Sequence, residues 1–181
     1  MKTPLIELPI STGDGRFIAR YSDKGLAELY FPKSRSLAES PLANTNGGQI
    51  DKHTKIQILR WHKLTSTALK KVLSGSEPSE LPPLDIKGTA FQKNVWNVMQ
   101  KLPAGKTKSY GEVAKAVGKP KAVRAVGSAC GANPLPVLVP CHRVLAAHGK
   151  IGGFGSGLHW KRTLLFREGV EFNGEVLIGP K

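Results

Sequence analysis

The chain has 181 residues, a formal net charge of +14 and 40% apolar residues. This length suits one domain, or one domain with a small partner, and the apolar content indicates a packed core rather than disorder. Two cysteines are too few for a disulfide scaffold or a four-cysteine zinc site. No apolar run approaches the roughly 18 residues of a membrane span. The first residues carry no apolar signal-peptide core, so we expect a cytosolic protein with no membrane partner.

The positive charge is concentrated in the second half. Residues 1–85 hold 12 basic and 9 acidic side chains, whereas residues 86–181 hold 15 basic and 4 acidic ones. Between Lys87 and Arg124 there are nine basic residues and a single acid, Glu112. An excess of one sign attracts polyanions, so the second half is a candidate nucleic-acid surface. A role in solubility is the alternative interpretation.

The first elements along the chain are predicted to be strands. Short, partly alternating segments at 5–10, 16–21 and 26–31 are separated by glycine-containing turn signals, which indicates an antiparallel meander. A polar loop is expected over 36–48. Helix-spaced apolar residues then predict a helix over 51–73.

A domain boundary is expected after this helix. Three prolines and two glutamates make 76–83 the best linker in the sequence, and it falls where the charge balance changes. We therefore place the boundary near residue 85, between an α/β domain over 1–85 and a mostly helical domain over 86–181.

The second half opens with two capped helices. Thr89 can cap a helix over 90–101, because its hydroxyl can accept a free backbone N–H. Ser109 and Glu112 have the spacing of a capping box, which opens a short helix that stops at Gly118.

A third helix is predicted over 121–130, with Pro120 in its first turn. Two short helices joined by a glycine-containing turn are typical of a helix-turn-helix, although such pairs also occur as plain packing units. Ala122, Ala125 and Ala129 share one face of this helix and have cations beside them. Such a face fits close approach to a narrow surface, and packing against a neighbouring helix is the alternative.

The last part of the chain is expected to contain a buried strand over 137–139, a glycine-rich loop over 149–157 and a helix over 158–167. Cys130 reads as a buried core thiol, and we expect no metal site because the two cysteines lack the close spacing of zinc ligands. The histidines in polar stretches are expected on the surface: His53, His62, His148 and His159.

Cys141 and His142 are the strongest candidates for chemistry. A free thiol ionises near pKa ~8.5, so a reactive cysteine needs a base or a positive field. Neighbouring side chains of an extended chain point to opposite faces, so a bridging water or a turn would be needed to connect the two. A histidine base needs an orienting partner, and Glu168 is the best candidate. A structural cysteine beside a solvated histidine is the alternative.

An ordered set of motifs across 86–169 resembles the O6-alkylguanine-DNA alkyltransferases, also called methylated-DNA–protein-cysteine methyltransferases. The active-site signature is Pro140-Cys141-His142-Arg143-Val144. The other matching motifs are Gly88-Thr89-Ala90-Phe91-Gln92, Val95-Trp96, Pro103-x-Gly105-x-Thr107-x-Ser109-Tyr110-Gly111, Arg124-Ala125-Val126-Gly127-x-Ala129, Asn133-Pro134, the glycine loop, Lys161, Leu164-Leu165 and Glu168-Gly169. The first half matches only loosely, as expected of the family's variable domain.

The resemblance implies direct DNA repair at a flipped-out base, because the alkyl carbon cannot be reached inside a duplex. Cys141 would accept the alkyl group, His142 would take its proton through a water, and Glu168 would orient the histidine. Tyr110 would give a hydrogen bond or proton to the guanine ring. Asn133 would brace the turn before the cysteine.

The resemblance also implies a fold and a set of contacts. The N-terminal α/β domain would be an antiparallel sheet plus helix, ribonuclease H-like, and the mostly helical C-terminal domain would carry a winged helix-turn-helix in the minor groove of double-stranded DNA. Arg124 would occupy the place of the flipped base. The residues expected at the DNA are Arg124, Lys121, Ala125, Ala129, Tyr110, Gly111 and Gln92. Those expected around the base are Val144, Pro136, Gly152, Phe154, Gly155, Ser156 and Lys161, the last as a support of the loop.

The expected substrates are O6-alkylguanine and O4-alkylthymine in DNA. Each molecule would react once, because the thioether product has no easy hydrolysis route. No cofactor, metal or obligate protein partner is expected, and the protein would be a monomer in the cytoplasm, at the nucleoid, or in a nucleus. Phe154 stands where many members have tyrosine, and Gly155-Ser156 also departs from the usual pair, which affects preference among alkyl groups.

Two other functions compete with repair. The chain could be a non-catalytic lesion sensor or a helix-turn-helix regulator. The related lesion sensors replace the acceptor cysteine, so the presence of Cys141 favours transfer. A Cys-His hydrolase is disfavoured because a basic DNA-binding face has no purpose there.

Overall fold

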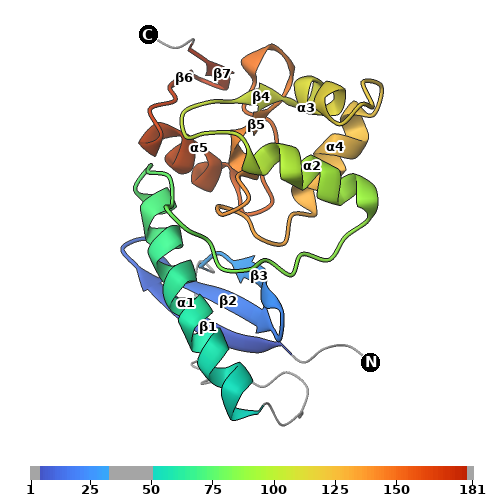
Figure 1. Cartoon of the computed structure of the whole chain (residues 1–181). Helices are drawn as coiled ribbons and strands as arrows, with labels where there is room; N and C mark the ends of the chain where they lie inside the picture. Colours follow the sequence, from blue (N-terminus) through green and yellow to red (C-terminus); the bar gives the residue numbers. More distant parts are fainter. Residues whose placement is uncertain (1–4, 33–50, 179–181) are drawn as a thin grey trace. The chain divides into compact units, whose positions relative to one another are not determined.

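The computed structural model describes residues 5–32 and 51–178, in two compact units (Figure 1). The first unit holds the described residues up to Lys70 together with Pro78–Lys87, and the second holds Lys71–Glu77 with the residues from Gly88 onward. The segment 71–77 precedes the expected boundary at residue 85 but groups with the second unit. The loop expected over 36–48 lies outside the described residues.

The first unit is built on a three-stranded antiparallel sheet in the order β1-β2-β3. Its strands are β1 (Ile6–Thr12), β2 (Gly15–Ser22) and β3 (Gly25–Tyr30). Side chains alternate along β2, so that Phe17, Ala19 and Tyr21 are fully buried. The predicted meander is therefore confirmed.

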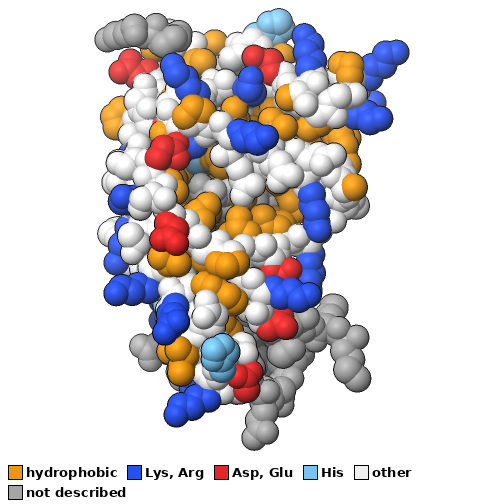
Figure 2. All heavy atoms as spheres, in the orientation of Figure 1, with side chains coloured by type: hydrophobic (Ala, Val, Ile, Leu, Met, Phe, Trp, Pro, Cys, Tyr) orange, Lys and Arg blue, Asp and Glu red, His pale blue; other side chains and the backbone are white. Residues whose placement is uncertain are grey.

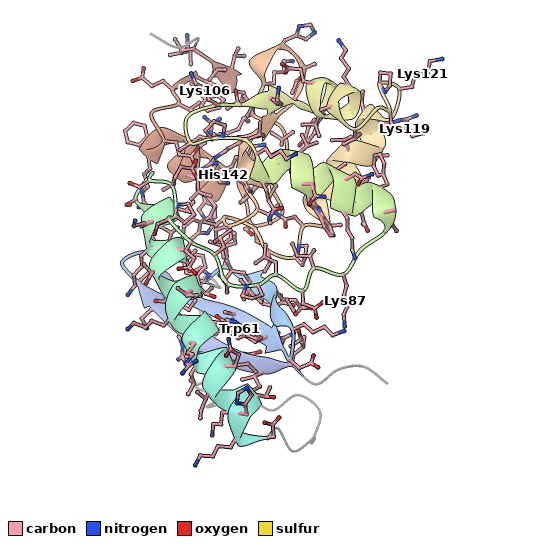
Figure 3. All side chains as sticks on the ribbon, in the orientation of Figure 1. Trp61, Lys87, Lys106, Lys119, Lys121 and His142 are labelled. Atoms are coloured by element: carbon pink, nitrogen blue, oxygen red, sulfur yellow. The ribbon has the colours of Figure 1, made fainter. Side chains whose placement is uncertain are left out.

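The helix of this unit, α1 (Lys52–Leu73), buries a stripe that includes Trp61 and Leu69. Figure 3 labels Trp61 on it. Asp51 caps its start by accepting the backbone N–H of Thr54 at 3.0 Å. The helix predicted over 51–73 is thus confirmed.

One histidine on α1 differs from its prediction. His62 was expected on the surface, but it is half-buried and its Nδ1 lies 3.1 Å from the Tyr21 hydroxyl. Burial lowers the pKa of His62. The polar residues next to His62 in the sequence predict an exposed side chain. Its partner Tyr21 lies 41 positions earlier, so the local sequence does not indicate this contact.

The second unit is mostly helical. Its helices are α2 (Ala90–Gln100), α3 (Tyr110–Ala116), α4 (Val123–Gly131) and α5 (Leu158–Arg167). The predicted cap at Thr89 and the capping box at Ser109 and Glu112 are both present. Helices α2, α3 and α4 pack against one another, and the indole of Trp96 donates to the Ala129 carbonyl at 2.8 Å. This bond holds α4 against α2.

The turn between α3 and α4 is longer than predicted. Gly118 takes a left-handed conformation with φ of +71°, and α4 begins at Val123 rather than at Lys121. Lys119 and Lys121 therefore lie in the turn, where both are exposed and point away from the second unit (Figure 3).

The strand predicted over 137–139 is wrong. These residues form a turn, with an isolated bridge between Pro136 and Val139 and a positive φ of 76° at Val137. Prolines at 136 and 140 bracket the apolar run and remove the backbone donors that a ladder needs. The apolar residues are buried as expected, but in a compact turn.

Short strands connect this turn to the helix pair. Strand β5 (Val144–Leu145) runs parallel to β4 (Lys108–Ser109), with Val144 opposite Lys108. Because β5 directly follows Cys141–Arg143 and β4 directly precedes α3, this pairing brings the cysteine segment beside the start of α3.

The remaining elements close the unit. They are the one-turn helices η1 (Cys141–Arg143) and η2 (Ala147–Gly149) and the hairpin of β6 (Phe172–Asn173) and β7 (Val176–Leu177). Leu145, Leu165 and Val170 form a buried cluster against this hairpin. Within residues 5–32 and 51–178, no helix has the length and apolar character needed to cross a membrane.

Candidate functional site

Cys141 lies at the start of a tight turn in the second unit. Its backbone N–H donates to the Val139 carbonyl at 2.8 Å, and the N–H of Arg143 donates to the Pro140 carbonyl at 3.0 Å. This one-turn helix replaces the extended chain that would have sent Cys141 and His142 to opposite faces. Both side chains are buried, with relative exposures of 7% and 0%.

His142 is held at one nitrogen and unpartnered at the other. Its Nε2 lies 2.9 Å from Glu168 Oε1, with both side chains almost fully buried. Among the described residues, Nδ1 is a buried side-chain nitrogen without a hydrogen-bond partner. Figure 3 labels His142 in the interior of the second unit, where its turn contacts α2 and α5.

The charges around this pair fix its protonation. Burial by itself raises the pKa of Glu168, but hydrogen bonds from His142 and Arg143 lower it to about 2. Burial lowers the pKa of His142, and Glu168 opposes that shift. An ionised carboxylate can only accept, so neutral His142 carries its proton on Nε2 and leaves a lone pair on Nδ1. The pair predicted from the sequence is thus present, with the geometry of an oriented base.

Arg143 is a site residue that the sequence analysis did not single out. Its Nε lies 3.1 Å from both oxygens of Glu168, and its Nη2 lies 2.8 Å from Oε1. Its Nη1 donates to the Leu102 carbonyl. The residue is 3% exposed. Its position within the signature motif was visible, but a buried charge cannot be recognised from the sequence.

The loop after α2 also contacts this network. The backbone N–H of Gly105 donates to Glu168 Oε2 at 3.2 Å. Gly105 has φ of +73°, and a Cβ there would lie 2.8 Å from the Glu168 carbonyl. Only glycine therefore fits this close approach without strain.

Asn133 supports the cysteine from the preceding turn. Its Nδ2 donates to the Val139 carbonyl at 2.7 Å, and its Oδ1 accepts the backbone N–H of Leu135 at 3.0 Å. Burial raises the pKa of the Cys141 thiol, while a hydrogen bond with Asn133 and the charge of Lys161 act in the opposite direction. Burial therefore favours the protonated thiol, which needs a base in order to react.

Lys161 links two parts of the predicted base pocket. Its Nζ donates to the Val144 carbonyl at 2.6 Å and to the Gly153 carbonyl at 3.2 Å, and the side chain is fully buried. Burial lowers the pKa of this lysine to about 8. Its geometry fits the predicted support of the glycine loop.

Tyr110, at the first position of α3, lies beside the same loop. A Cβ on Gly152 would be 3.3 Å from its hydroxyl. Burial raises the pKa of Tyr110, and the thiols of Cys130 and Cys141 raise it further, whereas a backbone hydrogen bond of Gly153 lowers it. The structure therefore brings Tyr110, the cysteine and the start of the loop together. Phe154 and Ser156 farther along the loop are half-buried, as is Pro136, and Gly155 is exposed.

The predicted DNA-facing residues divide into accessible and buried ones. Arg124, Ala125 and Lys121 are exposed, and Lys and Arg side chains gather at the α3–α4 end of the second unit (Figure 2). Ala129 is only 2% exposed and its carbonyl accepts the indole N–H of Trp96, so this predicted DNA contact offers almost no surface to DNA. Of the three alanines on the predicted face, only Ala129 is buried, and it lies in α4, which packs against α2.

Gln92 and Gly111 complete the predicted set. The side chain of Gln92 accepts the backbone N–H of Thr89 at 2.9 Å, which holds it at the start of α2. Gly111 is half-buried in the first turn of α3. Across residues 5–32 and 51–178, no cluster of three or more histidine, cysteine or acidic side chains could hold a metal ion.

Known proteins resemble this chain in sequence. Residues 90–170 match the family model described as 6-O-methylguanine DNA methyltransferase, DNA binding domain. The methylated-DNA–protein-cysteine methyltransferase of Methanosarcina mazei is 38% identical over 147 residues, which cover 79% of this chain and 84% of that protein. Its counterpart in Methanosarcina acetivorans is 52% identical over 94 residues, or 50% of this chain and 60% of that protein.

Solved structures extend the likeness to both halves. The crystal structure of Mycobacterium tuberculosis OGT in complex with DNA matches with a TM-score of 0.64 and 32% identity, covering 88% of this chain and 90% of that one. Several curated relatives match over only part of their length; the Mycolicibacterium paratuberculosis methyltransferase, for example, is matched over 52% of its length. The Methanosarcina mazei match spans most of both proteins. This chain belongs to the methylated-DNA–protein-cysteine methyltransferase family.

Proposed function

We propose that the protein repairs DNA directly by moving an alkyl group from O6-alkylguanine, or from O4-alkylthymine, onto Cys141. The observation that carries this proposal is the state of His142. Its Nε2 is fixed on ionised Glu168 while its Nδ1 has no partner among the described residues, one position after a buried thiol. This arrangement supplies a base to a cysteine that burial keeps protonated.

The proposed reaction balances without a cofactor or metal. A water relays the proton of the Cys141 thiol to Nδ1 of His142, and the sulfur attacks the alkyl carbon. The new S–C bond forms as the C–O6 bond breaks, and the electron pair of that bond leaves with guanine. Tyr110 gives a proton to the guanine ring and regains one from the solvent, while His142 releases its own.

The transfer would occur once per molecule. The product is a thioether, which has no easy hydrolysis route. Cys130 is a poor second acceptor because its thiol lies 3.5 Å from the Met99 sulfur in the core, and burial raises its pKa to about 12.

DNA is the proposed partner, bound in the minor groove by the α3–α4 pair. Exposed Arg124 and Ala125 at the start of α4 support this, as do the lysines in the turn before it. Arg124 would fill the space of the flipped base. Phosphate contacts by these cations would make binding weaken with salt.

The finer description of the fold belongs to the same proposal. The meander with α1 suits a ribonuclease H-like domain, and α3, α4 and the short strands suit a winged helix-turn-helix. We propose a supporting domain over 1–85 and a DNA-binding, alkyl-acceptor domain over 86–181. We also propose a monomer that acts where the cell keeps its DNA, in the cytoplasm or a nucleus.

A mass measurement tests the function. The protein is incubated with an oligonucleotide duplex carrying O6-methylguanine, and its intact mass is recorded. The mass should increase by one methyl group. The same increase is expected for Cys130→Ser, and no increase for Cys141→Ser. Tight binding without a mass change would favour the lesion sensor, and many turnovers per molecule would contradict the single-use mechanism.

A second variant tests base flipping. Arg124→Ala should slow repair of the duplex more than reaction with the free alkylated base, because only the duplex must hold a base out of its stack. The matched control is Lys121→Ala, which removes a neighbouring exposed charge. Equal losses for duplex and free base would contradict the flipping role.

A further inference from the structure

The segment after α1 packs against the His142–Glu168 network. The backbone N–H of Gly75 bonds to the Val72 carbonyl and that of Ser76 to the Lys71 carbonyl, in the pattern that ends a helix at a left-handed glycine. Gly75 has φ of +83°, and a Cβ there would lie 2.0 Å from the Arg167 carbonyl. A hydrogen bond joins the same two segments, because Arg167 Nη1 donates to the Leu73 carbonyl at 2.9 Å.

The turn at Gly75 places Glu77 beside Arg143. Glu77 Oε1 lies 3.1 Å from Arg143 Nη1. The same oxygen accepts the backbone N–H of Ala104. All of these residues belong to the second unit. Glu77 thus joins the loop after α2 to the guanidinium that holds Glu168.

Glu77 completes the hydrogen bonding of a buried guanidinium. Nε and Nη2 of Arg143 bind Glu168, whereas Nη1 binds the Leu102 carbonyl and Glu77. The fork of an arginine is rigid, so a partner at Nη1 also fixes the two nitrogens that face Glu168. Glu168 in turn holds Nε2 of His142.

We propose that Glu77 is a positioning residue for alkyl transfer, acting through Arg143 and Glu168 on His142. This inference rests on the proposed function. It gives the proline- and glutamate-rich linker a part in the chemistry, whereas the sequence assigned the linker only to the division between domains. Glu77 contacts Arg143 and the backbone of Ala104 rather than the thiol, so its effect is on the orientation of His142.

The test compares three full-length variants: Glu77→Ala, Glu77→Gln and Glu80→Ala. Glu80 is the matched control because it is an exposed acid of the same linker, three positions farther on. Single-turnover transfer is measured against DNA concentration and against pH. Glu77→Ala should lower the maximal rate about fivefold, the scale of a half-exposed ion pair, with the half-saturating DNA concentration unchanged.

The pH profile separates positioning from a loss of folded protein. The groups facing His142 are Glu168, Arg143, Lys161 and Cys141. The Glu168 contact raises the pKa of His142 and the charge of Arg143 lowers it, and both depend on where Arg143 is held, so the acidic limb of the profile should move in Glu77→Ala. A smaller folded fraction would scale the rate equally at every pH. Glu77→Gln keeps the acceptor oxygen and should recover most of the rate.

Each outcome decides the inference. A slower Glu77→Ala with a shifted acidic limb, recovery in Glu77→Gln and normal transfer by Glu80→Ala support it. A normal rate in Glu77→Ala, an equal loss in Glu80→Ala, an unshifted limb or no recovery in Glu77→Gln overturns it. Absence of transfer by the unchanged protein would instead overturn the proposed function, and this inference with it.

Discussion

The two units bury polar side chains of different kinds. Among the described residues of the first unit, the buried polar side chains are neutral: Tyr21, Ser22 and Thr65, which are hydrogen-bonded to His62, half-buried Asp85 and the Trp61 carbonyl, respectively. In the second unit the buried groups can carry charge: Arg143, Lys161, His142 and the side chain of Glu168. Burying a charge costs far more than burying a hydroxyl, even when the charge is paired. The second unit therefore bears a cost that stability alone does not explain, and two members of the charged cluster directly follow Cys141 in the chain.

The largest expected effect comes from breaking the charged cluster. Glu168→Gln removes the buried carboxylate that pairs with Arg143, which leaves half-exposed Glu77 as its remaining anion, and weakens the contact that holds the proton on Nε2 of His142. We expect a loss of about 3–5 kcal/mol in the free energy of unfolding, as for other broken buried ion pairs. The rate of alkyl transfer should fall about 10- to 100-fold, as when an orienting partner of a functional histidine is removed. Urea unfolding and single-turnover assays measure the two effects, with exposed Glu171→Gln as the control.

The stability effect should depend on acid. The pKa of Glu168 is lowered from 4.5 to about 2, so its ionised form stabilises the native state fully above about pH 4.5. That contribution is lost as pH falls toward 2. The difference in free energy of unfolding between the unchanged protein and Glu168→Gln should shrink over the same interval. A difference that stays constant from pH 5 to about 2 would show that ionisation of Glu168 does not stabilise the fold.

The same contrast explains what the sequence could predict. The meander, α1 and the capped helices follow from local periodicity and capping, which need no partner from elsewhere in the chain. His142 and Glu168 could be paired because few acids exist in the second half. The burial of Arg143 and Ala129 and the contact between Glu77 and Arg143 could not be predicted, because they depend on tertiary packing. The apolar run around Val137 predicts a strand, whereas the flanking prolines favour the turn that the structure shows.

An intermediate effect is expected at the buried lysine. Lys161→Met removes a charge whose pKa in the folded protein is about 8, below the ordinary 10.5. Between these values the unfolded chain binds the proton more strongly, so the native protein should gain stability as pH rises from about 8 toward 10.5, by up to about 3 kcal/mol. The methionine variant should lack this gain, and it should also loosen the glycine loop that Lys161 ties to Val144.

Urea unfolding at several pH values between about 7.5 and 10 measures this gain, and the difference between the two proteins removes contributions from other groups that titrate there. Parallel stability curves for the two proteins would mean that Lys161 titrates normally and that its burial carries no penalty.

The smallest effect is expected from a substitution in the first unit, where the described buried polar side chains are neutral. Tyr21→Phe removes the hydroxyl that meets His62 Nδ1 at 3.1 Å but keeps the buried ring and its edge-on contact with the imidazole. The hydroxyl loses only neutral partners, His62 and Thr65, so the free energy of unfolding should fall by about 1 kcal/mol. Single-turnover transfer should be unchanged, because no part of the Cys141 cluster loses a partner. A fall in the transfer rate comparable to that of Glu168→Gln would mean that the neutral network of the first unit also sets the chemistry, and the division between a neutral supporting core and a charged reactive one would no longer hold.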